Sequence, residues 1–275
     1  MDARPIGIFD TGVGGLTVVS EVMKALPGED IIYFGDTARV PYGSKSKETI
    51  TKFSLQIVNF LLSRGVKAMI VACNTISSNS YGELVKAADV PIMEVVRPGV
   101  AACAKATRSK VVGVIGTEAT VRSGLYEKYL LESMPGARVY SKACPLFVPL
   151  VEEGWTDNQV ARATAEIYLG ELLDKGIDSL LLGCTHYPVL INCIKEVAGE
   201  GVTVVNPAEA VAADMKKLLR ENGLESGRER ADGHTFFVSD NTPKFERTCE
   251  NVLGRRYGAV KVDIESENCE CPCCS

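Results

Sequence analysis

The fold is decided by two stretches of the sequence, GVKAMIVACNT at residues 65–75 and GIDSLLLGCTH at residues 176–186. Each begins with a glycine, continues through a short apolar run and ends at a cysteine followed by small polar residues. An apolar run of this length is typical of a parallel strand that helices cover on both faces. The sequence therefore predicts two buried parallel strands, with Cys73 and Cys184 directly after their carboxyl ends.

The segments that precede these two stretches are also alike. IGIFDTG begins at residue 6 and VVGVIGTEAT at residue 111, each a similar length of chain before its cysteine-bearing strand. Because ligands bind beyond the carboxyl ends of parallel strands, two facing halves would bring both cysteines to one cleft. We expect an α/β fold of two similar parallel-sheet halves related by pseudo-symmetry, with the active site in the cleft between them. The first domain is predicted to comprise residues 1–97 and 210–268, and the second residues 98–209.

Short β-branched runs alternate with longer amphipathic stretches along the rest of the chain, which indicates repeated βαβ units. Strands are predicted at 6–10, 31–34, 68–72, 91–95, 111–115, 138–140, 178–182, 202–205, 235–239 and 260–264. Helices are predicted between them, for example at 15–26, 46–64, 156–175 and 207–221. The polar stretch 224–234 is expected to be a surface connection.

Composition excludes several classes of protein. The chain has 275 residues, of which 46% are hydrophobic and 24% charged, with a formal net charge of −5, so it is neither disordered nor fibrous. An acidic chain without a basic patch is a poor partner for nucleic acid or an anionic membrane. The amino terminus, MDARPIGIFDTG, has no signal-peptide pattern. We therefore expect a cytoplasmic protein that binds neither nucleic acid nor membrane.

The chain contains ten cysteines but only two histidines, His186 and His234. In a cytoplasmic protein the cysteines are expected to be thiols rather than disulfides. Two histidines are too few for a histidine-rich centre, and we expect no metal in the functional site. The tail CECPCCS at residues 269–275 is predicted to be disordered and dispensable for catalysis, with zinc or soft-metal binding as the alternative.

Polar side chains at the predicted strand ends are candidates for chemistry. A thiol between a strand and a helix lies near the positive end of the helix dipole, which stabilises the thiolate and lowers the pKa. The structural alternative is that each cysteine is a small buried apolar residue. Asn74, Thr75 and Thr185 can bind a carboxylate or ammonium group, or can simply cap helices.

Asp10 and His186 are the candidate proton-transfer partners of these thiols. Asp10 ends the first predicted strand, where an aspartate can act as a general base, orient a thiol or bind an ammonium group. The glycines that follow it would let the backbone approach a ligand closely. They lack both the Rossmann spacing and a P-loop lysine, which argues against a nucleotide site. His186, two residues after Cys184, can exchange a proton near that thiol.

Six separated motifs stand out along the chain: FDTGVGGLTV (9–18), YFGDTARVPYGSKS (33–46), VACNT (71–75), GTEATVRS (116–123), CPLFVPLVEEG (144–154) and LLGCTHYP (181–188). Together they resemble the glutamate racemases, which are cofactor-independent isomerases that make D-glutamate for bacterial peptidoglycan. They occur in the family's order over roughly residues 5–265. Thr11 stands where the family more often has serine, which keeps a hydroxyl, and the cysteine-rich tail lies outside the family pattern.

The resemblance implies roles for individual residues and an oligomeric state. Cys73 and Cys184 would be the catalytic acid/base pair, Asp10 would assist Cys73, and Glu152 with His186 would assist Cys184. Cys73 would be the base for D-glutamate and Cys184 the base for L-glutamate. Substrate contacts would be made by Asp10, Thr11, Pro41, Tyr42, Gly43, Asn74, Thr75, Thr117, Thr120 and Thr185. The resemblance also implies a homodimer and no cofactor.

The chemistry of racemisation agrees with a pair of thiols. One base must remove the weakly acidic α-proton while a second group returns a proton to the opposite face, and a thiolate stays basic in a water-poor cleft. Three other functions stay open. The first is a racemase for aspartate or another small acid, or a related decarboxylase. The others are a thiol hydrolase with a Cys–His pair and a non-catalytic amino-acid-binding or metal-binding protein.

Overall fold

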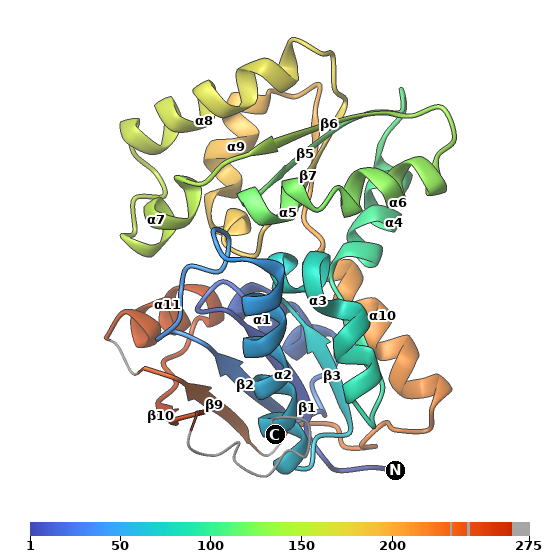
Figure 1. The fold of residues 1–275 in the computed structure, drawn as a ribbon, viewed down its shortest axis with the longest axis vertical. Coiled ribbons are helices and arrows are strands. Elements are labelled where there is room, and N and C mark those ends of the chain that lie inside the picture. Colours follow the sequence, from blue (N-terminus) through green and yellow to red (C-terminus); the bar gives the residue numbers. More distant parts are fainter. Residues whose placement is uncertain (232, 241–242, 266–275) are drawn as a thin grey trace.

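The fold consists of two parallel sheets, one in each half of the molecule (Figure 1). The computed structural model describes residues 1–231, 233–240 and 243–265. The larger sheet has the order β10-β9-β2-β1-β3-β4, and the smaller sheet has the order β6-β5-β7-β8. Every strand pairing described is parallel. The predicted fold class, two parallel-sheet α/β halves, is therefore confirmed.

The strands of the larger sheet are β1 (Ile6–Asp10), β2 (Ile31–Gly35), β3 (Ala68–Val71), β4 (Ile92–Glu94), β9 (His234–Val238) and β10 (Ala259–Lys261). Those of the smaller sheet are β5 (Val111–Gly116), β6 (Arg138–Ala143), β7 (Ser179–Gly183) and β8 (Thr203–Val205). Most bounds lie within one or two residues of the prediction. The differences are β6, which continues three residues further than predicted, and β10, which ends at Lys261 rather than at residue 264.

The two sheets share one strand order. The series β2-β1-β3-β4 in the larger sheet corresponds to β6-β5-β7-β8 in the smaller sheet, so β3 and β7 occupy equivalent positions. These are the strands that precede Cys73 and Cys184. The common order supports the internal repeat that the sequence indicates.

Helices cover both faces of each sheet. On the larger sheet, α1 (Leu16–Ala25), α10 (Ala208–Glu221) and α11 (Pro243–Leu253) form one apolar layer, and α2 (Lys47–Ser63) and α3 (Asn74–Ala87) form the other. On the smaller sheet, α4 (Val96–Ala106) and α6 (Leu125–Ser133) pack on one face, while α7 (Phe147–Glu152), α8 (Gln159–Leu173) and α9 (Ile191–Ala198) pack on the other. A short helix, α5 (Glu118–Arg122), follows β5. Burial on both faces explains the continuous apolar runs of the sequence.

The carboxy-terminal strands extend the larger sheet, because β9 pairs with β2 and β10 pairs with β9. The exact domain boundaries, 1–97 with 210–268 and 98–209, stay a prediction. The predicted disorder of residues 269–275 falls outside the described residues. None of the described helices has both the length and the apolar character needed to cross a bilayer.

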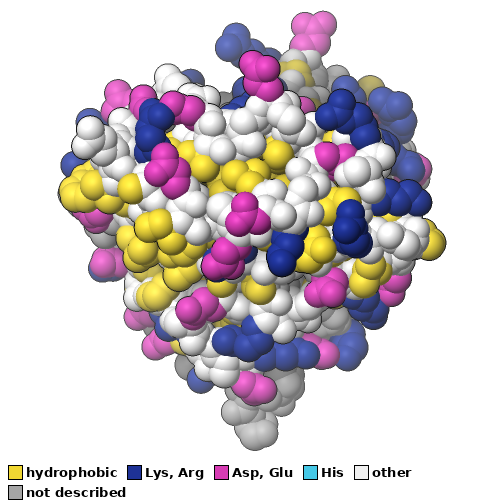
Figure 2. Space-filling view, turned by 90° about the horizontal axis from the view of Figure 1, so that it is seen from above, with side chains coloured by type: hydrophobic (Ala, Val, Ile, Leu, Met, Phe, Trp, Pro, Cys, Tyr) yellow, Lys and Arg dark blue, Asp and Glu magenta, His cyan; other side chains and the backbone are white. Residues whose placement is uncertain are grey.

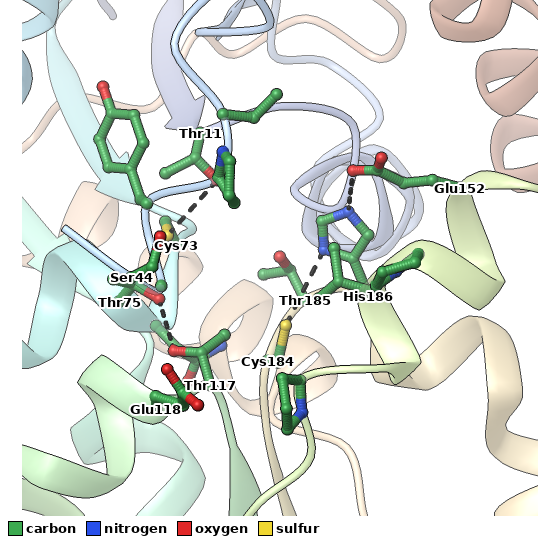
Figure 3. A pocket seen from close by; sticks show the side chains of 18 of the residues that line it. Thr11, Ser44, Cys73, Thr75, Thr117, Glu118, Glu152, Cys184, Thr185 and His186 are labelled. Carbon is green, nitrogen blue, oxygen red and sulfur yellow. Dashed lines mark hydrogen bonds and ion pairs between the residues drawn. The ribbon is translucent and has the colours of Figure 1, made fainter. Parts of the chain in front are cut away.

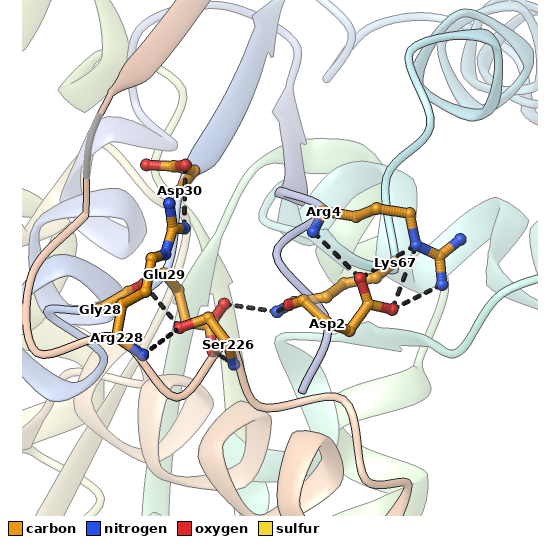
Figure 4. Close-up of polar contacts among 8 residues, drawn as sticks. All are labelled: Asp2, Arg4, Gly28, Glu29, Asp30, Lys67, Ser226 and Arg228. Carbon is orange, nitrogen blue, oxygen red and sulfur yellow. Dashed lines mark hydrogen bonds and ion pairs between the residues drawn. The ribbon is translucent and has the colours of Figure 1, made fainter.

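A buried ion pair lies at the edge of the larger sheet where β2 and β3 begin (Figure 4). The Lys67 ammonium lies 2.5 Å from the Glu29 carboxylate and donates to the backbone carbonyl of Asp2 at 2.6 Å. Glu29 also accepts from the backbone N–H of Ser226 at 2.8 Å. Ser226 is buried, so the predicted surface connection 224–234 is partly internal. These contacts fasten both the amino terminus and this connection to the sheet.

Candidate active site

Residues that follow strands of both sheets line one cavity of about 350 Å³. Cys73 comes from the larger sheet and Cys184 from the smaller one, and Figure 3 shows them on opposite sides of the space. This is the placement that the sequence predicts for the two thiols. The cavity also contains predicted substrate contacts from both halves, namely Thr11, Pro41, Tyr42, Gly43, Asn74, Thr75, Thr117 and Thr185.

Cys73 is the N-cap residue of α3 and is almost completely buried. Its thiol donates to the Thr11 hydroxyl, with 3.9 Å between sulfur and oxygen. Burial is the main cause that raises the pKa of Cys73 well above its ordinary value, and the Asp10 carboxylate adds to it. The backbone N–H of Ile76 acts in the opposite direction. The expected lowering of this pKa by the helix end is therefore wrong, because desolvation outweighs the helix.

Asp10 lies behind the cavity wall and is completely buried. One carboxylate oxygen, Oδ2, accepts from the backbone N–H of Gly15 at 2.6 Å and from the Thr185 hydroxyl at 3.4 Å. The other oxygen, Oδ1, has no hydrogen-bond partner among the described residues. The carboxylate is thus held by both halves of the molecule while it acts electrostatically on Cys73.

Cys184 has an imidazole beside it instead of a carboxylate. His186 Nδ1 lies 3.8 Å from the Cys184 sulfur, and His186 Nε2 lies 3.4 Å from a Glu152 carboxylate oxygen (Figure 3). Burial alone would lower the pKa of His186, but contacts with Cys184 and Glu152 more than offset it and raise the pKa to about 10. A protonated imidazole at this distance stabilises negative charge on the sulfur. Unlike Cys73, Cys184 precedes a 3₁₀ turn at Tyr187–Leu190 before α9 begins.

The glycines after Asp10 serve a different purpose from the expected one. A Cβ atom on Gly14 would lie 2.4 Å from Thr185 Oγ1 and 2.6 Å from His186 Nδ1. A Cβ atom on Gly15 would lie 2.6 Å from Asp10 Cβ. The close approach that these glycines allow is therefore to side chains of the protein itself, in the second half and at the end of β1.

Three hydroxyl groups from both halves meet beside Asn74. Thr75 Oγ1 lies 2.9 Å from Thr117 Oγ1 and 3.5 Å from Thr120 Oγ1, and the latter two lie 3.0 Å apart. Thr120 is buried behind the cavity wall and does not line it. The amide oxygen of Asn74 accepts from the Tyr126 hydroxyl. These groups connect α3 of the first half with α5 and α6 of the second.

Among the described residues that line the cavity there is no lysine or arginine, and the charged groups are His186, Glu118, Glu152 and Glu153. A carboxylate ligand must therefore be bound mainly by N–H and hydroxyl groups. Within the described part of the chain, the backbone N–H groups of Tyr42 and Gly43 have no acceptor, so both are available to an anion. Nor do any three described His, Cys, Asp or Glu side chains cluster as metal ligands.

Asp36 is the main residue at the site that sequence reasoning missed. It follows β2 directly and is completely buried. Its carboxylate accepts from the hydroxyl of Tyr42, a cavity residue. The criterion that selected Asp10, an acidic residue after a buried strand, also applies to Asp36 and could have found it.

Comparison with known proteins identifies the family. The sequence matches the Asp/Glu/Hydantoin racemase family over residues 12–215. It is 49% identical to a glutamate racemase of Geobacter metallireducens over 268 residues, which cover 97% of this chain and 99% of that protein. A glutamate racemase of Thermoanaerobacter pseudethanolicus is 45% identical over 96% of this chain and 99% of that protein.

Solved structures give the same result. The crystal structure of a Francisella tularensis glutamate racemase in complex with D-glutamate superposes with a TM-score of 0.91 at 39% identity, covering 97% of this chain and 100% of that one. An aspartate racemase of Picrophilus torridus, at 19% identity and a TM-score of 0.58 over 80% of this chain and 94% of that one, shares the fold. This chain therefore belongs to the Asp/Glu/Hydantoin racemase family.

Proposed function

We propose that this protein interconverts L-glutamate and D-glutamate by proton transfer at Cα, with Cys73 and Cys184 as the two acid/base groups. The observation that carries the proposal is the meeting of the two thiols, one from each half, at a single cavity. The names of the similar proteins and the D-glutamate bound to the Francisella enzyme support glutamate as the substrate.

The surroundings of the two sulfurs suit the direction from L- to D-glutamate. The raised pKa of Cys73 favours its thiol, which is the proton donor in this direction, and the positively charged imidazole of His186 lies beside Cys184, the proton acceptor. Cys184 then takes the α-proton of L-glutamate, and the Cys73 thiol gives its proton to the opposite face of Cα. The product is D-glutamate, with Cys73 left as thiolate and Cys184 as thiol. This state is the one that accepts D-glutamate for the reverse reaction.

Neutral donors and helix ends would bind the substrate carboxylates. The first turn of α3 offers Asn74 and Thr75 beside Cys73, where free N–H groups favour an anion. The Tyr42 and Gly43 N–H groups offer a second place. On this basis we propose that the residues predicted as substrate contacts bind glutamate. Asp10 and Thr120 do not line the cavity and would act through the residues that do.

Isotope exchange tests the proposal and separates it from its alternatives. The purified protein is incubated with L-glutamate in deuterated water, while optical rotation and the Cα proton signal are recorded. Loss of rotation with deuterium at Cα supports racemisation, and release of ammonia would instead indicate a hydrolase. A faster reaction with L-aspartate under the same conditions would change the substrate and keep the chemistry. No exchange with any amino acid would overturn the proposal.

We also propose that the protein supplies D-glutamate for peptidoglycan in the cytoplasm. Growth of a D-glutamate-requiring bacterium after introduction of this gene tests the role.

The proposed assembly is a homodimer. Figure 2 views the end of the molecule formed by the four-stranded half, where apolar side chains gather among charged ones. Leu146, Trp155, Val160 and Ile167 of this half are exposed large hydrophobic residues. Sedimentation of the protein and of Ile167→Glu tests whether this end is the interface: a dimer that the substitution dissociates supports it.

A further inference from the structure

The loop between β2 and α2 forms one wall of the cavity, through residues 40–44. Tyr42 is only 2% exposed, and its hydroxyl donates to Oδ2 of Asp36 rather than pointing to a ligand. Its ring packs against Phe53, with 5.8 Å between ring centroids. The bonded hydroxyl and the packed ring therefore fix where Tyr42, and with it the backbone of this loop, lies at the cavity wall.

Asp36, which is itself completely buried, is the centre of a hydrogen-bond network that holds this loop. Oδ2 accepts from Arg39 Nε at 2.7 Å as well as from Tyr42. Oδ1 accepts from the hydroxyl of Ser239 at 2.7 Å. A buried carboxylate needs several donors to offset the cost of its desolvation, and both of its oxygens are used here.

Ser239 brings the carboxy-terminal part of the chain into this network. It follows β9 directly, and its hydroxyl oxygen also accepts from the backbone N–H of Ala38 at 2.8 Å. The next residue, Asp240, exchanges hydrogen bonds with Thr37: the Thr37 hydroxyl donates to its carbonyl at 2.6 Å, and its N–H donates back at 2.9 Å. One end of the cavity loop is thus held by hydrogen bonds to residues that lie 203 positions further along the sequence.

We propose that Ser239 is a positioning residue for substrate binding, acting through Asp36 on Tyr42. The chain of contacts runs from the Ser239 hydroxyl through the Asp36 carboxylate to the Tyr42 hydroxyl. It holds the Tyr42 and Gly43 N–H groups, which have no acceptor among the described residues, at the cavity wall. Ser239 itself does not line the cavity. This inference rests on the proposed function, because those N–H groups are assigned to a substrate carboxylate.

The network acts on binding rather than on proton transfer. None of its hydrogen bonds is made to either sulfur: Cys73 donates to Thr11, and Cys184 lies beside His186. A loop that binds ground state and transition state alike changes KM and leaves kcat nearly constant. Loss of the Ser239 hydroxyl is therefore expected to raise KM for both enantiomers.

The experiment compares Ser239→Ala with Ser239→Thr, which keeps the hydroxyl. Ser226→Ala is the control, since Ser226 is a buried serine whose hydroxyl donates to the Gly28 carbonyl at 2.7 Å and which does not line the cavity. We expect Ser239→Ala to raise KM about tenfold for L- and D-glutamate with kcat within about twofold, as for a lost bond to a charged group. Ser239→Thr restores most of the affinity, and Ser226→Ala lowers only the melting temperature.

A double mutant shows whether the effect passes through Asp36. If Ser239 acts on Tyr42, then Ser239→Ala and Tyr42→Phe together raise KM by much less than the product of their separate effects. Additive effects, an unchanged KM in Ser239→Ala, or a fall in kcat alone would each overturn the inference. An unmutated protein that does not racemise glutamate in the same assay would overturn the proposed function instead. If Ser239→Ala does not fold, the KM of Tyr42→Phe tests the inference instead. A KM equal to that of the unmutated protein would refute the chain of contacts from Ser239 through Asp36 to Tyr42.

Discussion

The two halves place their cysteines at equivalent strand ends but surround them differently. Cys73 has a carboxylate behind it and a hydroxyl beside it, whereas Cys184 has an imidazole that is paired with a carboxylate. The common strand order fixes where each sulfur lies. The neighbouring side chains then give each sulfur a different electrostatic environment. Duplication of a fold can therefore supply two acid/base groups whose surroundings differ in charge.

Replacement of either cysteine by serine should have the largest effect. We expect racemisation to fall by about 10³-fold or more, because a hydroxyl is a far weaker base than a thiolate and the remaining thiol lacks a partner. With a glutamate analogue that carries a leaving group at Cβ, Cys184→Ser should still eliminate it from the D-enantiomer and Cys73→Ser from the L-enantiomer. Chiral analysis of the residual substrate gives the selectivity. Equal losses for both enantiomers in both variants would contradict a two-base site, and opposite selectivity would exchange the two roles.

Replacement of the neighbouring groups should separate the two halves by direction. Asp10→Asn removes the charge that makes Cys73 a stronger base and should lower kcat from D- to L-glutamate about tenfold more than the reverse. His186→Asn removes the charge that stabilises the Cys184 thiolate and should do the opposite. Initial rates at saturating substrate in both directions provide the measurement. Equal changes in kcat for both directions would mean that the two thiols share one electrostatic environment.

Stability should depend on pH through the second half. The pKa of His186 is raised from 6.5 to about 10 on folding. Its protonation therefore stabilises the folded state fully below pH 6.5, and this contribution is lost as pH rises through 10. Denaturant unfolding of the unmutated protein and of His186→Asn should give a difference that is largest below pH 6.5 and shrinks towards pH 10. A constant difference over this range would contradict the raised pKa.

Glycine substitutions should give smaller effects that mark where the halves touch. Gly14→Ala inserts a methyl group between the halves at the position of Thr185 and His186. It should destabilise the protein by about 1–3 kcal/mol and lower activity, because the imidazole must move. Gly82 in α3 and Gly170 in α8 have open space where a Cβ atom would be added. Their alanine variants should stabilise by about 0.5–1 kcal/mol without changing kinetics. Thermal unfolding and rate measurements on all three variants test the contrast, and a harmless Gly14→Ala would argue against close packing there.

Local patterns in the sequence predict the strands and their ends well, because burial on both faces demands continuous apolar runs. Cys73, Cys184 and Asp10 could be found for this reason. The direction of the Cys73 pKa shift could not, since it depends on how much water the folded cavity excludes. Nor could the contact between Asp36 and Ser239, which joins side chains 203 positions apart. Such contacts follow from the order of strands in the sheet, where β9 lies beside β2.

L- and D-glutamate are mirror images with equal free energy in water, so the equilibrium constant of the proposed reaction is one. The ratio kcat/KM must then be the same in both directions, whichever groups surround the two sulfurs. The carboxylate behind Cys73 and the imidazole beside Cys184 can make kcat unequal only if KM becomes unequal by the same factor. An unsymmetrical site can therefore determine which enantiomer saturates the protein at lower concentration, but it cannot make either one accumulate.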